Sequence, residues 1–332
     1  MDRSVPKILK YLLCATVAGV LLYYSFRDVN WSDFVAGLKA CDWPFVILSM
    51  LCGVAAFWFK GMRWTQMLRP VAPGVKYLDT YDAVTVGNLS NIVFPFLGDF
   101  VRAGYVRRNS AGKYDRALGT VALERVWDLL FVFILMALLV ILKWEEFGGF
   151  VVERLWRPAI DRFDLAVWIA LAILALLAAA FVAAVVFLHA RNSFLGRVHN
   201  ACSGLAQGFV SVFRMDRKLL FLVGTALIWT MYWLQIVCLF HAFPPAAGLG
   251  PDDALFIMLV GSLASFVPVP GGFGAYHYLV AFALSSMYGL PWQAGIVFAT
   301  IAHESQAITM TVTGLLSVIR QELAGAEALG QS

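Results

Sequence analysis

The chain has 332 residues, of which 61% are hydrophobic and 14% are charged, and its formal net charge is +4. Soluble domains carry about 25% charged residues, so this composition excludes a soluble domain and predicts an all-α protein that crosses the membrane several times. The five cysteines form no CxxC pattern, so they indicate neither a metal nor a redox site. The sequence has no basic tract interleaved with aromatic residues, which argues against a nucleic-acid partner.

Six apolar stretches are long enough to cross a bilayer, which takes about 20 residues. They are residues 8–26, 43–68, 117–143, 164–190, 217–243 and 291–320. Within the first stretch, the apolar run from Tyr11 to Phe26 follows three basic residues and could resemble a signal peptide, but no small-residue cleavage site follows it. We therefore expect a retained first span and a single transmembrane domain over residues 1–332.

Two further segments, residues 80–110 and 253–288, are apolar but interrupted by proline and glycine. The interrupting residues are Pro95 and Gly98 in the first segment and Pro268, Pro270, Gly271, Gly272 and Gly274 in the second. When the segments are laid together, Pro95 and Gly98 fall on Pro268 and Gly271, so the two breaks look like copies. Lipid tolerates unpaired backbone only where protein or water covers it, and matching breaks in two halves point to a transporter's substrate site.

The distribution of basic residues predicts how the broken segments meet the membrane. If the six apolar stretches cross and both broken segments return to the face they entered, most of the 25 Lys and Arg residues lie on the cytoplasmic side. If both broken segments crossed fully, the basic loop over 191–218 would move outside. The charges thus predict two re-entrant hairpins and cytoplasmic termini. Three crossings separate the hairpins, so they enter from opposite faces as an inverted repeat, with their tips near the midplane.

The first hairpin carries two charged residues after its break, Asp99 and Arg102. We expect a helix to begin again after Gly98, with Asp99 at or near its N-cap and Arg102 one turn later. Free amides and the helix dipole at such an N-terminus suit a phosphate, so both residues are candidates for binding an anionic headgroup. Asp99 could instead act only as the cap, and Asn88, Ser90 and Asn91 before the break could satisfy the broken backbone or bind a substrate.

The third long apolar stretch contains three charged residues, Glu124, Arg125 and Asp128. Glu124 and Asp128 share a helical face, and Arg125 lies three residues before Asp128 and can pair with it. Charges within a membrane span are costly, so the group is a candidate site for an anionic headgroup held by Arg125. The alternative is a neutralised ion pair that only locks the packing of helices.

The second hairpin and the last span carry a further polar group, formed by His277, His303 and Glu304. Histidine can titrate near neutral pH, so this group is a candidate for substrate binding with a proton-coupled step. A packing role for each histidine is the alternative. Two His and one Glu could ligate Zn²⁺, but no HExxH or similar spacing supports a metal site, and we expect no metal and no cofactor.

In this order, three blocks of residues resemble the transmembrane domain family of lysylphosphatidylglycerol synthases, also called the flippase-like family. The blocks are Pro95, Gly98, Asp99 and Arg102; Glu124, Arg125 and Asp128; and Pro270, Gly271, Gly272 and Gly274. The resemblance covers roughly residues 8–320. In that family an acidic residue usually follows the glycine string and an arginine lies in the last span, whereas here His277 and His303 take those places.

The resemblance implies a lipid flippase of the bacterial inner membrane that moves an anionic, aminoacylated or polyprenyl-phosphate-linked lipid between leaflets. It implies a membrane lipid as substrate and lipid-biosynthesis enzymes as possible partners. The soluble aminoacyl-transferase domain of the full synthases is missing, so a transporter is expected rather than an enzyme. The alternatives are a lipid-modifying enzyme, a membrane subunit that supports a glycosyltransferase, and a scaffold whose buried charges are packing pairs.

Overall fold

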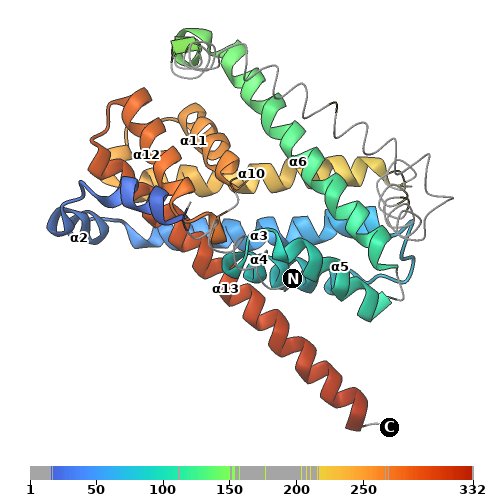
Figure 1. The fold of residues 1–332 in the computed structure, drawn as a ribbon. Helices are drawn as coiled ribbons and strands as arrows, with labels where there is room; N and C mark the ends of the chain where they lie inside the picture. Colours follow the sequence, from blue (N-terminus) through green and yellow to red (C-terminus); the bar gives the residue numbers. More distant parts are fainter. Residues whose placement is uncertain are drawn as a thin grey trace. The chain divides into compact units, whose positions relative to one another are not determined.

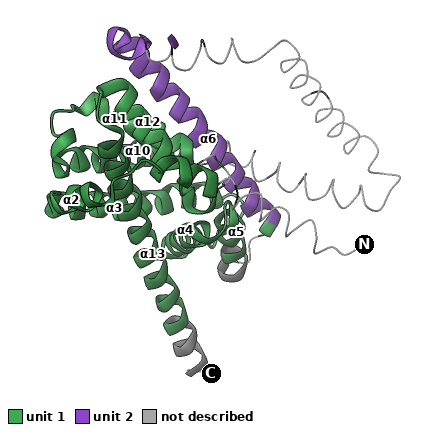
Figure 2. Ribbon diagram, turned by 60° about the vertical axis from the view of Figure 1, so that its left-hand side comes forward, with its two compact units in different colours: residues 1–114, 214–332 green, residues 115–213 purple. Residues whose placement is uncertain are grey.

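The computed structural model describes residues 18–110, 113–149, 217–265 and 269–330, with a few isolated positions between these stretches. All regular structure in the described residues is helical, which confirms the all-α prediction. The chain forms two compact units, residues 1–114 with 214–332 (unit 1) and residues 115–213 (unit 2), shown in Figure 2. The predicted span 164–190 and Pro268 lie outside the described residues.

Three helices are long and apolar enough to cross a membrane: α3 (Trp43–Leu68), α6 (Tyr114–Leu142) and α10 (Lys218–Ala242). They coincide with the predicted spans 43–68, 117–143 and 217–243. Helix α6 belongs to unit 2 and is followed there by a π-helical turn, Trp144–Gly148. The total of six spans stays a prediction.

Helices α3 and α10 pack along each other in unit 1 (Figure 1). Small residues bring the two helices together, because a Cβ on Gly224 of α10 would lie 3.4 Å from the Cβ of Arg63 on α3. The short helix α2 (Trp31–Lys39) precedes α3, and its N-cap is Asn30, whose side chain accepts a hydrogen bond from the Ser32 amide. This cap satisfies one of the amides left unpaired at the start of the helix.

The first broken segment consists of α4 (Tyr77–Val93) and α5 (Leu97–Ser110), which pack against each other. Proline lacks an amide proton, and Phe96 between the helices has a positive φ of 62°. The backbones approach closely at Gly87 and Gly98, since a Cβ on Gly98 would lie 2.0 Å from the Gly87 carbonyl oxygen. Asn91 accepts a hydrogen bond from the Gly98 amide at 2.7 Å and thereby closes the break.

The second broken segment consists of α11 (Pro251–Ala264), a 3-10 turn over Pro270–Gly272 (η6) and α12 (Ala275–Tyr288). Three glycines in the turn, Gly271, Gly272 and Gly274, have φ values of 59°, 79° and 81°. L-residues with a side chain rarely adopt such angles, so glycine is required here. Gly274 also lies against the helix formed by residues 18–26, where its Cβ would be 2.9 Å from the backbone nitrogen of Leu22.

The two breaks meet within unit 1. A Cβ on Gly271 would lie 3.5 Å from the carbonyl oxygen of Ile92, in the last turn of α4, and α4 contacts η6. The long helix α13 (Trp292–Gly330) packs against both α12 and α4 and therefore touches both broken segments. In Figures 1 and 2 its C-terminal part extends past the other helices of unit 1.

Candidate functional site

Arg102 lies on α5, one turn after the first break, and its side chain is buried with 3% of its surface exposed. Its guanidinium carbon lies 4.2 Å from the ring centroid of Trp64 on α3, in a cation–π contact. Gly87 leaves room for the stem of this side chain, since a Cβ there would lie 2.6 Å from Arg102 Cγ. The structure thus places a buried cation where α3, α4 and α5 meet.

Asp99 lies in the first turn of α5. The helix begins at Leu97, so Asp99 is the third residue of this turn and not the residue that precedes the helix. A carboxylate at this position interacts favourably with the partial positive charge of the helix N-terminus. Of the two roles considered for Asn91, the structure shows the bond to the broken backbone, through the Gly98 amide.

The second break carries a cluster of three ionisable side chains from two helices. His277 lies in the first turn of α12, and His303 and Glu304 lie on α13. The ring centroids of the two histidines are 5.0 Å apart. Glu304 Oε1 lies 3.0 Å from His303 Nδ1 and 3.9 Å from His277 Nε2. The structure therefore brings together the three polar residues that the sequence analysis grouped.

A backbone carbonyl of the glycine turn fixes the orientation of His303. His303 Nε2 lies 2.8 Å from the carbonyl oxygen of Gly271, and only a protonated nitrogen can donate to that oxygen. The ring of Phe273 packs edge-on against His303, with ring centroids 4.7 Å apart. The turn, α12 and α13 therefore form one polar centre with aromatic walls.

Helix α13 also carries a row of buried hydroxyl residues that the sequence analysis did not identify. The row consists of Ser305, Thr309, Thr313 and Ser317, spaced by four residues and therefore on one helical face. Ser317 accepts a hydrogen bond from the Thr85 hydroxyl of α4 at 2.8 Å. A Cβ on Gly314 would lie 2.7 Å from the Cβ of Leu89, so α13 and α4 pack tightly along this face.

A buried ion pair lies at the far end of this row. Asp82 of α4 is fully buried and pairs with Arg320 of α13, and it also accepts a hydrogen bond from Gln321 Nε2 at 2.6 Å. The sequence analysis missed Asp82, although an acidic residue within the apolar segment 80–110 was a visible signal. The sequence analysis did not single out Arg63 of α3 either, which is 1% exposed and whose Nη1 lies 3.5 Å from the Thr225 hydroxyl of α10.

The charged group of the third apolar stretch lies on α6, in unit 2. Glu124 is 1% exposed, and Arg125 and Asp128 are half-buried. All three side chains take part in interactions. Their role in binding a headgroup stays a prediction.

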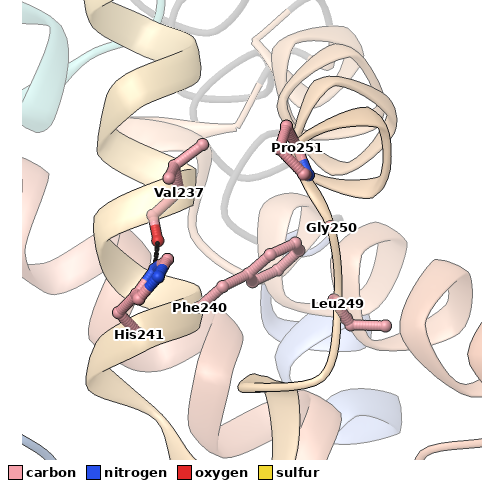
Figure 3. Close-up of a pocket in the computed structure, with 6 residues that line it drawn as sticks. All are labelled: Val237, Phe240, His241, Leu249, Gly250 and Pro251. Carbon is pink, nitrogen blue, oxygen red and sulfur yellow. Dashed lines mark hydrogen bonds between the residues drawn. The ribbon is translucent and has the colours of Figure 1, made fainter.

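None of these charged residues lines the pocket found in unit 1. It is lined by Val237, Phe240, His241, Leu249, Gly250 and Pro251 (Figure 3). Its single ionisable side chain, His241, contacts the carbonyl oxygen of Val237 in its own helix at 2.9 Å. The pocket wall is otherwise apolar or backbone, so it offers little to recognise a charged headgroup.

Comparison with known proteins gives one match. No curated protein and no solved structure matches this chain. The family model for the lysylphosphatidylglycerol synthase TM region matches residues 9–314. This match includes all three blocks of residues described above, together with the helices that are apolar enough to cross a membrane. The chain therefore belongs to the lysylphosphatidylglycerol synthase transmembrane-region family, which indicates a membrane protein with a lipid-related function.

Proposed function

We propose that this protein moves a lipid with an anionic headgroup between the two leaflets of its membrane. The observation that carries the proposal is the meeting of the two breaks, where Gly271 lies against the carbonyl of Ile92. Irregular backbone is tolerated at membrane depth only where protein or a water-filled cavity covers it. In transporters built from repeats, such paired breaks surround the substrate site.

The lengths of the broken helices support re-entrant hairpins. Helices α5, α11 and α12 have 14 residues each, which corresponds to about 21 Å at 1.5 Å per residue. The hydrocarbon core of a bilayer is about 30 Å thick. Each of these helices is therefore too short to cross upright, and both breaks are expected near the midplane.

Arg102 is the residue that we propose to bind the headgroup. A guanidinium presents several donors in a planar fork that fits phosphate oxygens, and phosphate is the group shared by the candidate lipids. Because Arg102 is covered in this structure, the headgroup reaches it only when α5 moves away from Trp64. Such a movement is what alternating access requires, with the acyl chains remaining in lipid.

The proposal is tested by lipid transfer in reconstituted vesicles. Fluorescent phosphatidylglycerol is placed in both leaflets, and the inner pool that becomes accessible to a membrane-impermeant quencher is followed over time. Arg102→Gln is expected to slow the transfer about tenfold or more, because a hydrogen bond to a charged group contributes about 1.5–3 kcal/mol. Arg102→Lys keeps the charge but loses the planar fork. Its transfer rate is expected to lie between those of Arg102→Gln and the unmodified protein.

Exposed Arg69, which follows α3, provides the matched control. Arg69→Gln removes the same charge and should leave the transfer rate unchanged. Equal transfer rates for Arg102→Gln and the unmodified protein would overturn the assignment of Arg102.

The proposed function as a whole has its own test. If the unmodified protein transfers no lipid but turns over a lipid-linked sugar, the proposed function is contradicted and an enzyme is favoured. Arg125→Ala tests the group on α6 independently.

A further inference from the structure

The cluster at the second break has the composition of a metal site. His277, His303 and Glu304 each offer one ligand atom, and these atoms all lie within 4.8 Å of one another. Both histidines are buried, while the Glu304 side chain is 40% exposed. Two histidines and one carboxylate are a ligand set typical of zinc sites that keep a fourth position open.

The contacts of His303 require a proton or a metal ion between its Nδ1 and Glu304. Its Nε2 donates to the carbonyl of Gly271, so the neutral ring has its lone pair on Nδ1. That nitrogen lies 3.0 Å from Oε1 of Glu304, and an ionised carboxylate is also only an acceptor. Two acceptors at this distance repel each other unless a proton or a metal ion lies with them.

The bond to Gly271 is also the contact that a metal-ligating histidine usually makes. Such histidines donate their second ring nitrogen to a carboxylate or backbone carbonyl, which fixes the tautomer and aims the other nitrogen at the metal. His303 already has this arrangement, and its Nδ1 faces Glu304.

His277 supplies independent evidence. Its side chain is 3% exposed, and within the described part of the chain neither ring nitrogen makes a hydrogen bond. A buried polar group without a partner costs about 1–3 kcal/mol. Its Nε2 is turned toward Glu304 at 3.9 Å, which is too long for a hydrogen bond. A metal ion between them would give Nε2 a ligand bond, while Nδ1 would keep its present surroundings.

We propose that His277, His303 and Glu304 bind one divalent transition-metal ion of the Zn²⁺ class. Metal–ligand bonds of about 2.0–2.1 Å place tetrahedral ligands about 3.3 Å apart. His303 and Glu304 are already near this separation, and His277 has to approach Glu304 by about half an ångström. The bound ion joins α12 to α13, and the Gly271 carbonyl joins both to the glycine turn. The proposal does not depend on lipid movement.

The experiment uses the full chain, purified in detergent with a tag that contains no histidine. After removal of metal with a chelator, Zn²⁺ is titrated by calorimetry and Co²⁺ by visible absorption. We expect one ion per chain, an intense d–d absorption typical of tetrahedral Co²⁺, and a higher melting temperature on binding. His277→Gln, His303→Gln and Glu304→Gln are each expected to weaken binding at least tenfold.

His241 provides the control, because its ring contacts its own helix and lies outside the cluster (Figure 3). His241→Gln should bind the metal as the unmodified protein does. Glu304→Cys replaces the carboxylate by a thiolate, another zinc ligand, and should retain binding if Glu304 is a ligand. Failure of the unmodified protein to bind Zn²⁺ overturns the proposal and assigns the space between His303 and Glu304 to a proton. Binding that survives all three Gln substitutions overturns it as well.

Discussion

The ion pair between Asp82 and Arg320 joins two residues that are far apart in the sequence. Asp82 is fully buried, whereas the side chain of Arg320 is 44% exposed. Loss of the cation leaves a buried carboxylate with only Gln321 as hydrogen-bond donor to Oδ2. Arg320→Gln is therefore expected to destabilise the protein by about 2 kcal/mol, measured as a lower melting temperature in detergent.

The double variant Asp82→Asn/Arg320→Gln tests this explanation. An uncharged amide does not require the cation, so the double variant should melt at a higher temperature than Arg320→Gln alone. If both variants melt at the same temperature, the charge of Asp82 is not the cause of the destabilisation.

Residues that break helices were predictable from the sequence, whereas partners between helices were not. The positive φ angles at Gly271, Gly272 and Gly274 follow from a chemical property of glycine that is visible in isolation. The burial of Arg63 was not predicted, because nothing in the neighbouring sequence shows that Thr225 of α10 faces it. Contacts of this kind depend on how helices pack.

At the scale of elements, the contact between α4 and α5 depends on Gly98. A Cβ there would lie 2.0 Å from the backbone carbonyl oxygen of Gly87, and no side-chain rotation can separate the two atoms. Gly98→Ala is expected to separate the two helices and to destabilise the protein by about 1–3 kcal/mol. The measurement is the midpoint of thermal unfolding in detergent.

Gly104 on the same helix provides the comparison. A Cβ on Gly104 would lie 4.0 Å from Tyr114 Cε2, so an added methyl group makes an ordinary van der Waals contact. Gly104→Ala should stabilise α5 by about 0.5–1 kcal/mol, since alanine is the better helix former. Equal destabilisation by both substitutions would show that the close approach at Gly98 is not the cause.

The glycine turn gives a second prediction for an element. Gly274 combines a φ of 81° with close contacts to Leu21 and Leu22. Gly289, at the end of α12, has a φ of 67° but no neighbour within 4 Å of its Cβ. Both alanine variants suffer backbone strain, which is about 1–2 kcal/mol for the left-handed conformation of Gly289. Only Gly274→Ala should also detach the helix over residues 18–26, measured as faster hydrogen exchange of its amides.

One result would contradict the predicted difference between the two alanine variants. If Gly274→Ala and Gly289→Ala have the same melting temperature and the same rates of amide hydrogen exchange, the contact between the turn and the helix over residues 18–26 does not stabilise the protein. The glycine spacing in the sequence predicted the turn, because glycine allows the backbone angles that a turn needs. It could not predict which segment packs against the turn.

At the scale of the whole molecule, the predicted topology can be tested by measuring which loop positions are accessible from outside the cell. Single cysteines replace four exposed residues, Gly74, Lys113, Gly248 and Pro291, in a background without native cysteines. Re-entrant hairpins place Gly74 and Lys113 together on the cytoplasmic face and the other two together outside. An impermeant maleimide added to intact cells should therefore label positions 248 and 291 and spare positions 74 and 113.

Full crossings would give a different labelling pattern. If α4 and α5 crossed as one distorted span, position 113 would label and position 74 would not. The basic residues alone favour the hairpins, but a charge count cannot distinguish a short helix pair from a distorted span. The packing of α4 against α5 supports a hairpin, and the labelling pattern tests it.

Helix α13 is fastened at two distant points, at His303 beside the glycine turn and at Arg320 beside the start of α4. His303 and Arg320 are 17 positions apart, which corresponds to about 25 Å of helix, and α4 itself reaches from Asp82 to the Gly271 contact. The two antiparallel helices are therefore joined near both ends of their contact. A movement of α13 that breaks one of these contacts also strains the other.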